Sequence, residues 1–338
     1  MALRLLQANL NHCARAQDLF IQSLAQWSID LAVTSEPYLV PDRNNWVGDL
    51  NQLVAIYAGG TPPIVSTRRG RSCVGVKLFG IALIGVYFSP NRSLTDFEEY
   101  LDEVSSFVQW GRPLAVVVAG DLNAKSRAWG SSVTDSRGEV LLSWMAQHNL
   151  TPLNTGSVHT CVRMQGGSVV DVTLASPALA CRVRDWEVLT EVETLSDHRY
   201  IRFDILPSST PPTSRSTVTP QEIGQMWSLR SLDREAVELA AIVGTWSHRM
   251  EDKGVDDGVR WLGEVLAHIS DCAMSKVRPS PRRPNRVYWW SDNLSQLRSA
   301  CVLARRQYTR YRRRRPGWEE SEERRLYTGY QEAKKALR

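Results

Sequence analysis

The first 206 residues alternate between short apolar runs and segments with helical spacing. The runs are long enough for buried strands and far too short for membrane spans, and a Gly or polar residue ends most of them. The predicted strands are Leu3–Asn9, Asp30–Glu36, Arg71–Leu78, Gly80–Phe88 and Leu114–Ala119. Further β-rich runs follow between residues 151 and 206.

Three helices are predicted between these strands, at Ala14–Trp27, Leu94–Trp110 and Glu139–His148. The second is the clearest, because its apolar residues recur at helical spacing, Ser93 begins a capping box with Asp96, and Gly111 follows its end. Strands with helices between them predict an α/β architecture in which helices cover the sheets.

Composition divides the rest of the chain. The predicted parts are a domain at 1–206, a Pro/Ser/Thr-rich linker at 207–220, a helical segment at 221–275, a basic linker at 276–286 and a basic helical segment at 287–338.

The net charge of +5 is unevenly distributed. Residues 279–338 hold 16 Lys or Arg and 6 Asp or Glu, a net +10, so the remaining residues carry 25 basic and 30 acidic groups, a net −5. A basic tail on an acidic body indicates a polyanionic partner. An alternative for the tail is a solvated helix face, and a third is a nuclear import signal.

The totals exclude several classes of protein. An apolar content of 43% with 23% charged residues describes a globular chain, and no apolar run approaches the ~20 residues of a membrane span. Six cysteines without a CxxC pair exclude a zinc ribbon and a compact disulfide scaffold. Because no secretory signal precedes the first strand, we expect reduced thiols and an intracellular, nuclear location.

Polar side chains stand at the ends of several buried strands. Asp121 and Asn123 follow the run 116–119, and comparable positions are Asn9, Glu36, Asp171, Asp197 and His198. Burying such groups costs solvation energy unless they find partners or a cation. Oxygen donors suit Mg²⁺, with Mn²⁺ as the alternative. A cation with an acid/base pair is sufficient for phosphodiester hydrolysis.

Six short motifs occur in the order found in the endonuclease/exonuclease/phosphatase superfamily. They are Gln7–Asn11, Ser35–Tyr38, Val86–Pro90, Gly120–Ala124, Val170–Thr173 and Ser196–His198. The chain most resembles the endonuclease domain of a non-LTR retrotransposon. The resemblance implies a four-layer sandwich of two packed mixed β-sheets flanked by helices, followed here by the basic helical extension.

The resemblance also implies roles for individual residues. Glu36, Asn9 and Asp197 would bind the metal. Asp121 would position or activate the attacking water. The resemblance places Asn123 and Tyr87 on the phosphate, and pairs Asp171 with His198. Asn11 stands where some relatives have a second acidic ligand.

DNA contacts are expected from Ser89, Asn91 and the hairpin Val158–Val170, through Thr160 and Arg163. For this hairpin the alternative is a plain exposed turn without DNA contact. Two-stranded ribbons of this kind are used by other proteins to enter a groove of DNA.

These implications predict a Mg²⁺-dependent endonuclease that nicks a double-stranded DNA target and leaves a 3′-hydroxyl for target-primed reverse transcription. The reverse transcriptase domain itself is absent from this chain, and the basic segment would bind element RNA or DNA. The alternatives are an abasic-site endonuclease or phosphoesterase of the same fold, and an inactive nucleic-acid-binding remnant.

Overall fold

The computed structural model describes residues 2–59, 64–163, 166–207, 226–227, 232–246, 255–274, 276–277, 289–313 and 319–338. They divide into two compact units, Met1–Ser209 with Pro284–Arg338, and Thr210–Arg283.

The first unit contains a six-stranded sheet in the order β13-β14-β1-β2-β4-β3. Its strands are β1 (Leu3–Asn9), β2 (Leu31–Ser35), β3 (Trp46–Gly48), β4 (Val54–Ala58), β13 (Val183–Val188) and β14 (Ile201–Ile205). The sheet is mixed, because β1 and β2 are parallel while the other neighbours are antiparallel.

A second six-stranded sheet has the order β5-β6-β7-β8-β12-β9. Its strands are β5 (Ser66–Arg69), β6 (Cys73–Leu78), β7 (Ile81–Tyr87), β8 (Ala115–Asp121), β9 (Thr151–Pro152) and β12 (Asp171–Ala175). Here β7 and β8 form the parallel pair. A separate two-stranded ribbon consists of β10 (Cys161–Arg163) and β11 (Gly166–Ser168).

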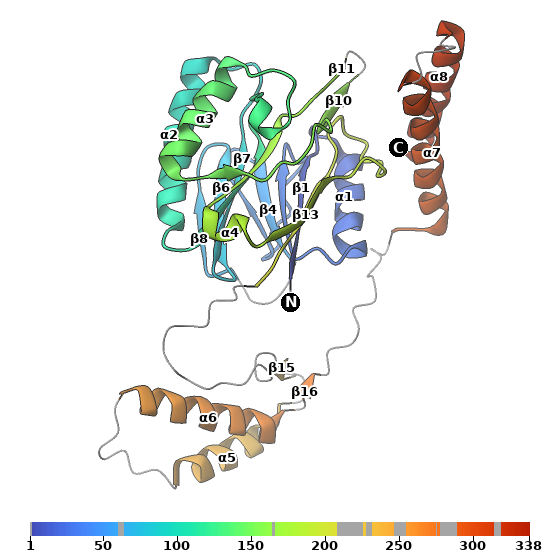
Figure 1. Ribbon diagram of the computed structural model, residues 1–338. Coiled ribbons are helices and arrows are strands. Elements are labelled where there is room, and N and C mark those ends of the chain that lie inside the picture. Colours follow the sequence, from blue (N-terminus) through green and yellow to red (C-terminus); the bar gives the residue numbers. More distant parts are fainter. Residues whose placement is uncertain are drawn as a thin grey trace. The chain divides into compact units, whose positions relative to one another are not determined.

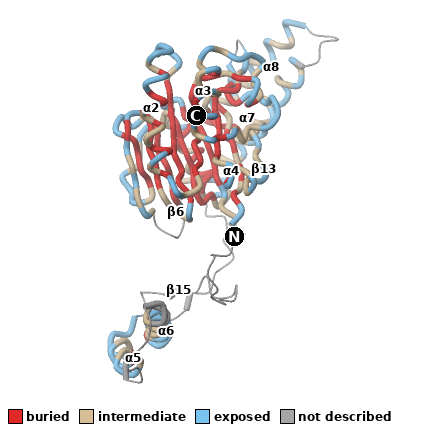
Figure 2. Tube along the Cα trace, turned by 60° about the vertical axis from the view of Figure 1, so that its left-hand side comes forward, coloured by how far each residue is buried: buried red, intermediate tan, exposed pale blue. Residues whose placement is uncertain are grey.

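Helices cover the outer faces of the two sheets, giving four layers (Figure 1). The helices α2 (Leu94–Gly111) and α3 (Ser136–His148) lie on one side, and α1 (Ala14–Gln26) lies on the other. A short 3-10 turn at Arg127–Trp129 and α4 (Pro177–Ala180) complete this region. The central strands of the two sheets are the most buried part of the described residues (Figure 2).

Each interface between layers has its own apolar core. One cluster, including Leu31, Ile56 and Phe203, fills the space between the sheets. A second joins the β5–β9 sheet to α2 and α3, and a third lies under α1. The predicted sandwich of two packed mixed sheets flanked by helices is therefore confirmed.

The predicted elements differ from the observed ones mainly at their ends. The strand predicted from Arg71 begins at Cys73, because Ser72 has φ 66°. The strand predicted through Glu36 ends at Ser35, because Glu36 has φ 46°. The helix α2 includes Gly111, and the capping box of Ser93 with Asp96 is present.

The basic C-terminal segment forms two helices, α7 (Asp292–Arg313) and α8 (Glu320–Leu337), within the first unit. Trp290, Cys301 and Leu337 are buried in the same apolar cluster as Phe20 and Tyr200. The helices are therefore tied to the sandwich through an apolar core and not only through charge.

Arginines of α7 bind a loop of the sandwich. Arg305 lies 3.3 Å from the Glu193 carboxylate, which is 1% exposed, and donates to the carbonyls of Thr190 and Val192. Arg298 donates to the Glu193 carbonyl. Acidic and carbonyl partners from a distant part of the sequence therefore offset part of the arginine charge.

Two further arginines of the basic segment also have acidic partners. Arg306 pairs with Glu191, and Arg312 pairs with Glu323 at 3.2 Å. Much of the local positive charge is therefore neutralised within the protein itself.

The second unit contains α5 (Arg234–Trp246) and α6 (Val255–Ala273), as the helical pattern of 221–275 predicts. Two short strands, β15 (Met226–Trp227) and β16 (Lys276–Val277), pair with each other. The predicted linker 207–220 lies outside the described residues from position 208 onward, as does 276–286 from position 278 onward.

The Arg305–Glu193 pair yields a stability prediction. Arg305→Leu should destabilise the protein by ~3–5 kcal/mol, because it leaves a buried carboxylate without its cation. The double variant Arg305→Leu/Glu193→Leu should recover most of the loss. Urea unfolding of the full chain measures both, and equal stability of Arg305→Leu and the parent protein would contradict the interpretation.

Candidate functional site

Strand register brings three of the predicted side chains into one row. In the β5–β9 sheet, Tyr87 of β7 is paired with Asp121 of β8, and Asp121 is paired with Asp171 of β12. Asn9 is paired with Ser35 at the corresponding end of the other sheet. Neighbouring strands lie about 4.8 Å apart, so the pairing alone places Asp121 close to Asp171.

Gly120 allows the backbone of β8 to turn into the site. Its φ is 154°, and a Cβ at this position would lie 1.8 Å from the Val86 carbonyl oxygen. A side chain cannot be accommodated without displacing β7. The glycine of the Gly-Asp motif is thus required by the close approach of two strands.

A buried triad of Asp171, His198 and Asp121 forms the centre of the site. His198 Nδ1 lies 2.8 Å from the Asp171 carboxylate, and His198 Nε2 lies 3.9 Å from the Asp121 carboxylate. All three side chains are at most 5% exposed. A hydrogen bond from Nδ1 to Asp171 fixes the imidazole so that Nε2 faces Asp121.

The two carboxylates and the imidazole perturb one another. Burial, with the charge of Asp171 adding to it, raises the pKa of Asp121 to about 7. Burial alone would lower the pKa of His198, but the charge and hydrogen bond of Asp171 raise it well above its usual value. Two titratable groups with raised pKa values therefore face each other, which is typical of a functional site.

Glu36 lies beside this triad and is held by two side chains. The Tyr87 hydroxyl donates to Glu36 Oε1 at 2.5 Å, and Asn9 Nδ2 donates to Glu36 Oε2 at 2.9 Å. Burial, and then this hydrogen bond, raises the pKa of Tyr87. The same Asn9 amide donates to Asp121 at 3.0 Å, so Asn9 connects the Glu36 and Asp121 carboxylates.

The carboxylate of Asp197, the third predicted metal ligand, faces a different partner. It is 40% exposed and lies 3.6 Å from Nε of Arg163. Its neighbour Ser196 donates to the Asn9 carbonyl at 2.8 Å, which keeps this loop against the end of β1. Of the three predicted ligands, hydrogen bonds thus join Asn9 and Glu36, while Asp197 pairs with the β10–β11 ribbon.

Two groups of described residues could hold a cation. Ligand atoms of Asp121, Asp171 and His198 all lie within 4.8 Å of one another. His198 Nδ1 is occupied by Asp171 in this group, which suits proton transfer better than metal ligation. The alternative anchor is Glu36, 17% exposed, with the amide oxygen of Asn9, which here accepts from the Asn11 backbone amide at 2.8 Å.

The ribbon residues predicted to contact DNA are placed very differently. Arg163 is exposed, whereas Thr160 is fully buried and its hydroxyl accepts hydrogen bonds from the amides of Val170 and Asp171. The placement of Thr160 argues against its predicted DNA contact. Thr160 instead holds the base of the ribbon beside β12.

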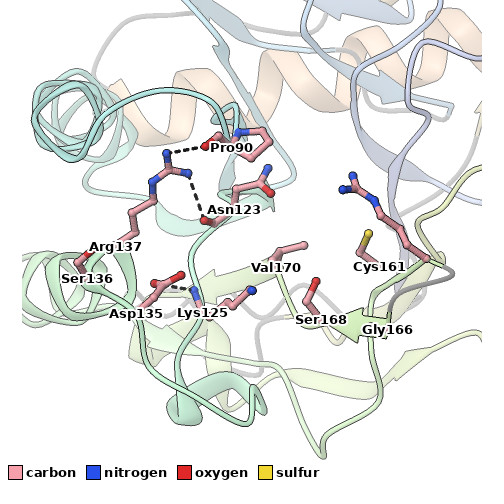
Figure 3. A pocket seen from close by; sticks show the side chains of 12 residues that line it. Pro90, Asn123, Lys125, Asp135, Ser136, Arg137, Cys161, Gly166, Ser168 and Val170 are labelled. Atoms are coloured by element: carbon pink, nitrogen blue, oxygen red, sulfur yellow. Dashed lines mark hydrogen bonds between the residues drawn. The ribbon is translucent and has the colours of Figure 1, made fainter.

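A pocket of about 580 Å³ lies between the ribbon and the loops that follow β7 and β8 (Figure 3). Asn123 and Lys125 line it, and the Lys125 side chain extends into it between Asp135 and Val170. Asn123 Nδ2 donates to the Phe88 carbonyl at 3.1 Å. Ser89 is half-buried and Asn91 exposed on the neighbouring loop.

Several supporting residues were not singled out from the sequence. Arg137 donates to the carbonyls of Ser89, Pro90, Arg92 and Asn123, and so holds the two loops together. The buried Gln7 amide donates to the Gly120 carbonyl from the opposite sheet. The sequence could have indicated this role, because an amide side chain within an apolar strand, as at Gln7 in the Gln7–Asn11 motif, needs a hydrogen-bond partner.

None of the helices in the described parts of the chain combines the length and hydropathy that crossing a lipid bilayer requires. The comparison with curated protein sequences gave no significant match.

Residues 81–202 match a family model described as endonuclease-reverse transcriptase. Among solved structures, the endonuclease domain of TRAS1, a telomere-specific non-LTR retrotransposon, matches with a TM-score of 0.52 and 26% identity. The match covers 60% of this chain and 98% of that domain.

Two more distant structures share the fold. The 3′-5′ exonuclease of Neisseria meningitidis matches at 19% identity, over 60% of this chain and 100% of its own, with a TM-score of 0.52. An AP endonuclease from Archaeoglobus fulgidus matches at 14% identity, over 60% of this chain and 99% of its own, with the same TM-score. The two packed sheets and their flanking helices therefore share the sandwich fold of these nucleases, and the chain is similar to the endonuclease domain of a non-LTR retrotransposon.

Proposed function

We propose that the chain is a divalent-metal-dependent endonuclease that nicks double-stranded DNA and leaves a 3′-hydroxyl. The observation that carries the proposal is the buried arrangement of Asp171, His198 and Asp121, with His198 Nδ1 2.8 Å from Asp171 and Nε2 3.9 Å from Asp121.

Asp121 is the group proposed to orient and deprotonate the attacking water. Its raised pKa makes it a stronger base than an ordinary carboxylate, and it becomes ionised near neutral pH. The protonated His198, fixed by Asp171, would stabilise the charge that develops on the phosphoryl oxygen. Tyr87 and Asn123 would hydrogen-bond the same phosphate.

The residues present fit a Mg²⁺ or Mn²⁺ ion. Oxygen donors dominate the site, and the Glu36 and Asp121 carboxylates approach each other closely enough for one amide group, that of Asn9, to donate to both. Glu36 and Asn9 would hold the ion, with Asp197 as the third ligand. When bound, the ion would neutralise phosphate oxygens and the leaving group.

The match to a retrotransposon endonuclease supports DNA as the substrate and target-primed reverse transcription as the context. A reverse transcriptase acting on the new 3′-hydroxyl and a nuclear location belong to the same proposal. The structure of the related Neisseria enzyme with a product DNA hairpin is consistent with a DNA ligand for this fold. Ser89, Asn91 and Arg163 remain the proposed DNA contacts.

Nicking should depend on the metal and on the triad. With supercoiled plasmid, Asp121→Asn and His198→Ala should each lower the nicking rate by ~10²–10⁴-fold, because each removes a positioned acid or base. EDTA should abolish nicking by the parent protein, and Mg²⁺ should restore it.

Matched controls are Asp102→Asn on the exposed side of α2 and His268→Ala on α6, which should nick like the parent. An abasic duplex and a small phosphoester run in parallel distinguish the alternative activities. Unchanged nicking in both triad variants would refute the assigned roles, and selective abasic cleavage would replace plasmid nicking as the activity.

The raised pKa of Asp121 predicts a pH-dependent stability in the metal-free protein. In the folded protein the Asp121 carboxyl group keeps its proton up to about pH 7, whereas in the unfolded chain it loses the proton near pH 3.8. Unfolding between these two pH values therefore releases a proton. The free energy of unfolding of the parent should therefore fall relative to that of Asp121→Asn as the pH rises through this window.

Each unit of pKa difference corresponds to about 1.4 kcal/mol, so the change should amount to a few kcal/mol at most. Urea unfolding in EDTA at several pH values measures it, with Asp102→Asn as the variant that should track the parent. Parallel pH profiles for the parent and Asp121→Asn would show that the Asp121 carboxyl is not perturbed.

A further inference from the structure

We propose that the groove between the β10–β11 ribbon and the α7–α8 helices binds a single strand of DNA, continuous with the strand that is cut beside His198. The continuity of this strand with the cleaved strand rests on the proposed endonuclease function. The binding itself does not, because it can be measured without metal and without cleavage.

The groove has a volume of about 810 Å³ and reaches the proposed catalytic residue His198. Ser196 and Asp197 are also among its lining residues. The helices supply the opposite wall through Tyr308, Tyr327 and Lys334, among others. A ligand held in this groove is therefore within reach of the proposed reaction centre.

The charge of the lining favours a polyanion. Five Lys or Arg side chains line the groove and Asp197 is the single acidic residue among its lining residues. Arg163 is paired with Asp197, Arg305 with Glu193 and Arg312 with Glu323, whereas Lys334 has no ion pair within 4.0 Å among the described residues. Phosphate groups would find a positive, hydroxyl-rich surface here.

The aromatic wall favours a nucleic acid strand with accessible bases. The rings of Tyr308 and Tyr327 are 5.3 Å apart, those of Tyr308 and Tyr330 are 6.5 Å apart and stacked, and all three line the groove. Half-buried aromatic rings beside basic side chains are the combination on which single strands stack. The groove volume is that of a small-ligand pocket, which accommodates a few nucleotides and not a duplex.

Contacts with the sandwich hold the helical wall of the groove in place. Arg298 donates to the Glu193 carbonyl, and Trp290 and Cys301 are buried against the sandwich. Tyr330 approaches Glu193 at 3.4 Å. The helices therefore present a fixed surface. Binding of a strand would then require little loss of conformational entropy in the helices.

The ribbon divides this groove from the pocket that contains Asn123. Arg163, Gly166 and Gly167 line both cavities. A duplex engaged by the Asn123 side and a strand entering the α7–α8 side would meet at the ribbon. This separation of two cavities by one ribbon indicates that the two sides take different parts of the nucleic acid.

The test compares two neighbouring lysines of α8 in the full chain. Lys334 lines the groove, whereas Lys335 does not, so Lys334→Glu and Lys335→Glu make the same charge change on the same turn. Fluorescence anisotropy in EDTA measures binding of single-stranded DNA of about 16 nucleotides, of a blunt duplex, and of RNA with the same sequence as the single strand.

We expect Lys334→Glu to weaken single-strand binding by ~10-fold and to reduce its salt dependence, since one phosphate contact is lost. Tyr327→Ala should weaken it by a similar factor through lost stacking. Lys335→Glu should stay within about twofold of the parent, and none of the three variants should change blunt-duplex binding by more than about twofold.

Equal effects of the two lysine variants, or equal loss of duplex and single-strand binding in Lys334→Glu, would overturn the proposal. RNA binding as tight as DNA binding would overturn the assignment to DNA. Plasmid nicking with Mg²⁺, measured on the same preparations, tests the proposed function separately. A parent that binds the strand but does not nick would refute the endonuclease and leave the binding groove standing.

Discussion

The burial of charged groups where two sheets end is the constraint on which this structure depends. Asp121, Asp171 and His198 are almost completely removed from water, and each would be costly there alone. Strand register places Asp121 beside Asp171, and their burial is tolerable because His198 lies 2.8 Å from the Asp171 carboxylate and 3.9 Å from that of Asp121, and because Asn9 and the Asn123 backbone amide donate to Asp121. The same contacts also raise the pKa of His198 and act on that of Asp121. Stability and chemistry are thus coupled in one set of hydrogen bonds.

The sequence was most informative where residues follow buried strands. Asn9, Asp121 and Asp171 could be located because apolar runs end at each of them, and the register of parallel and antiparallel neighbours then brings them together. The sequence could not show which partner each side chain would choose. Asp197 lies next to His198 in the chain, yet its carboxylate faces Arg163 of the ribbon. Such choices depend on loop geometry, which local pattern does not determine.

The C-terminal arginines show a second limit of sequence interpretation. A run of basic residues looks unneutralised when only its neighbours in the chain are considered. Arg305 and Arg306 in fact meet Glu193 and Glu191, more than a hundred residues earlier. For Thr160, the position in a predicted hairpin suggested contact with DNA. Its hydroxyl instead accepts hydrogen bonds from the backbone amides of Val170 and Asp171. The roles of these residues depend on their burial and on partners that are distant in the sequence, and residue type alone does not reveal either.

The short β10–β11 ribbon forms a shared partition between two cavities. Any change in its length or in the bulk of Arg163 alters both compartments at once. A change in the ribbon that alters ligand binding in one cavity is therefore expected to alter binding in the other. Ligand binding in both cavities should be measured for any variant of the ribbon. Residues that line only one compartment, such as Lys125 or Lys334, are the positions where a single compartment can be tuned alone.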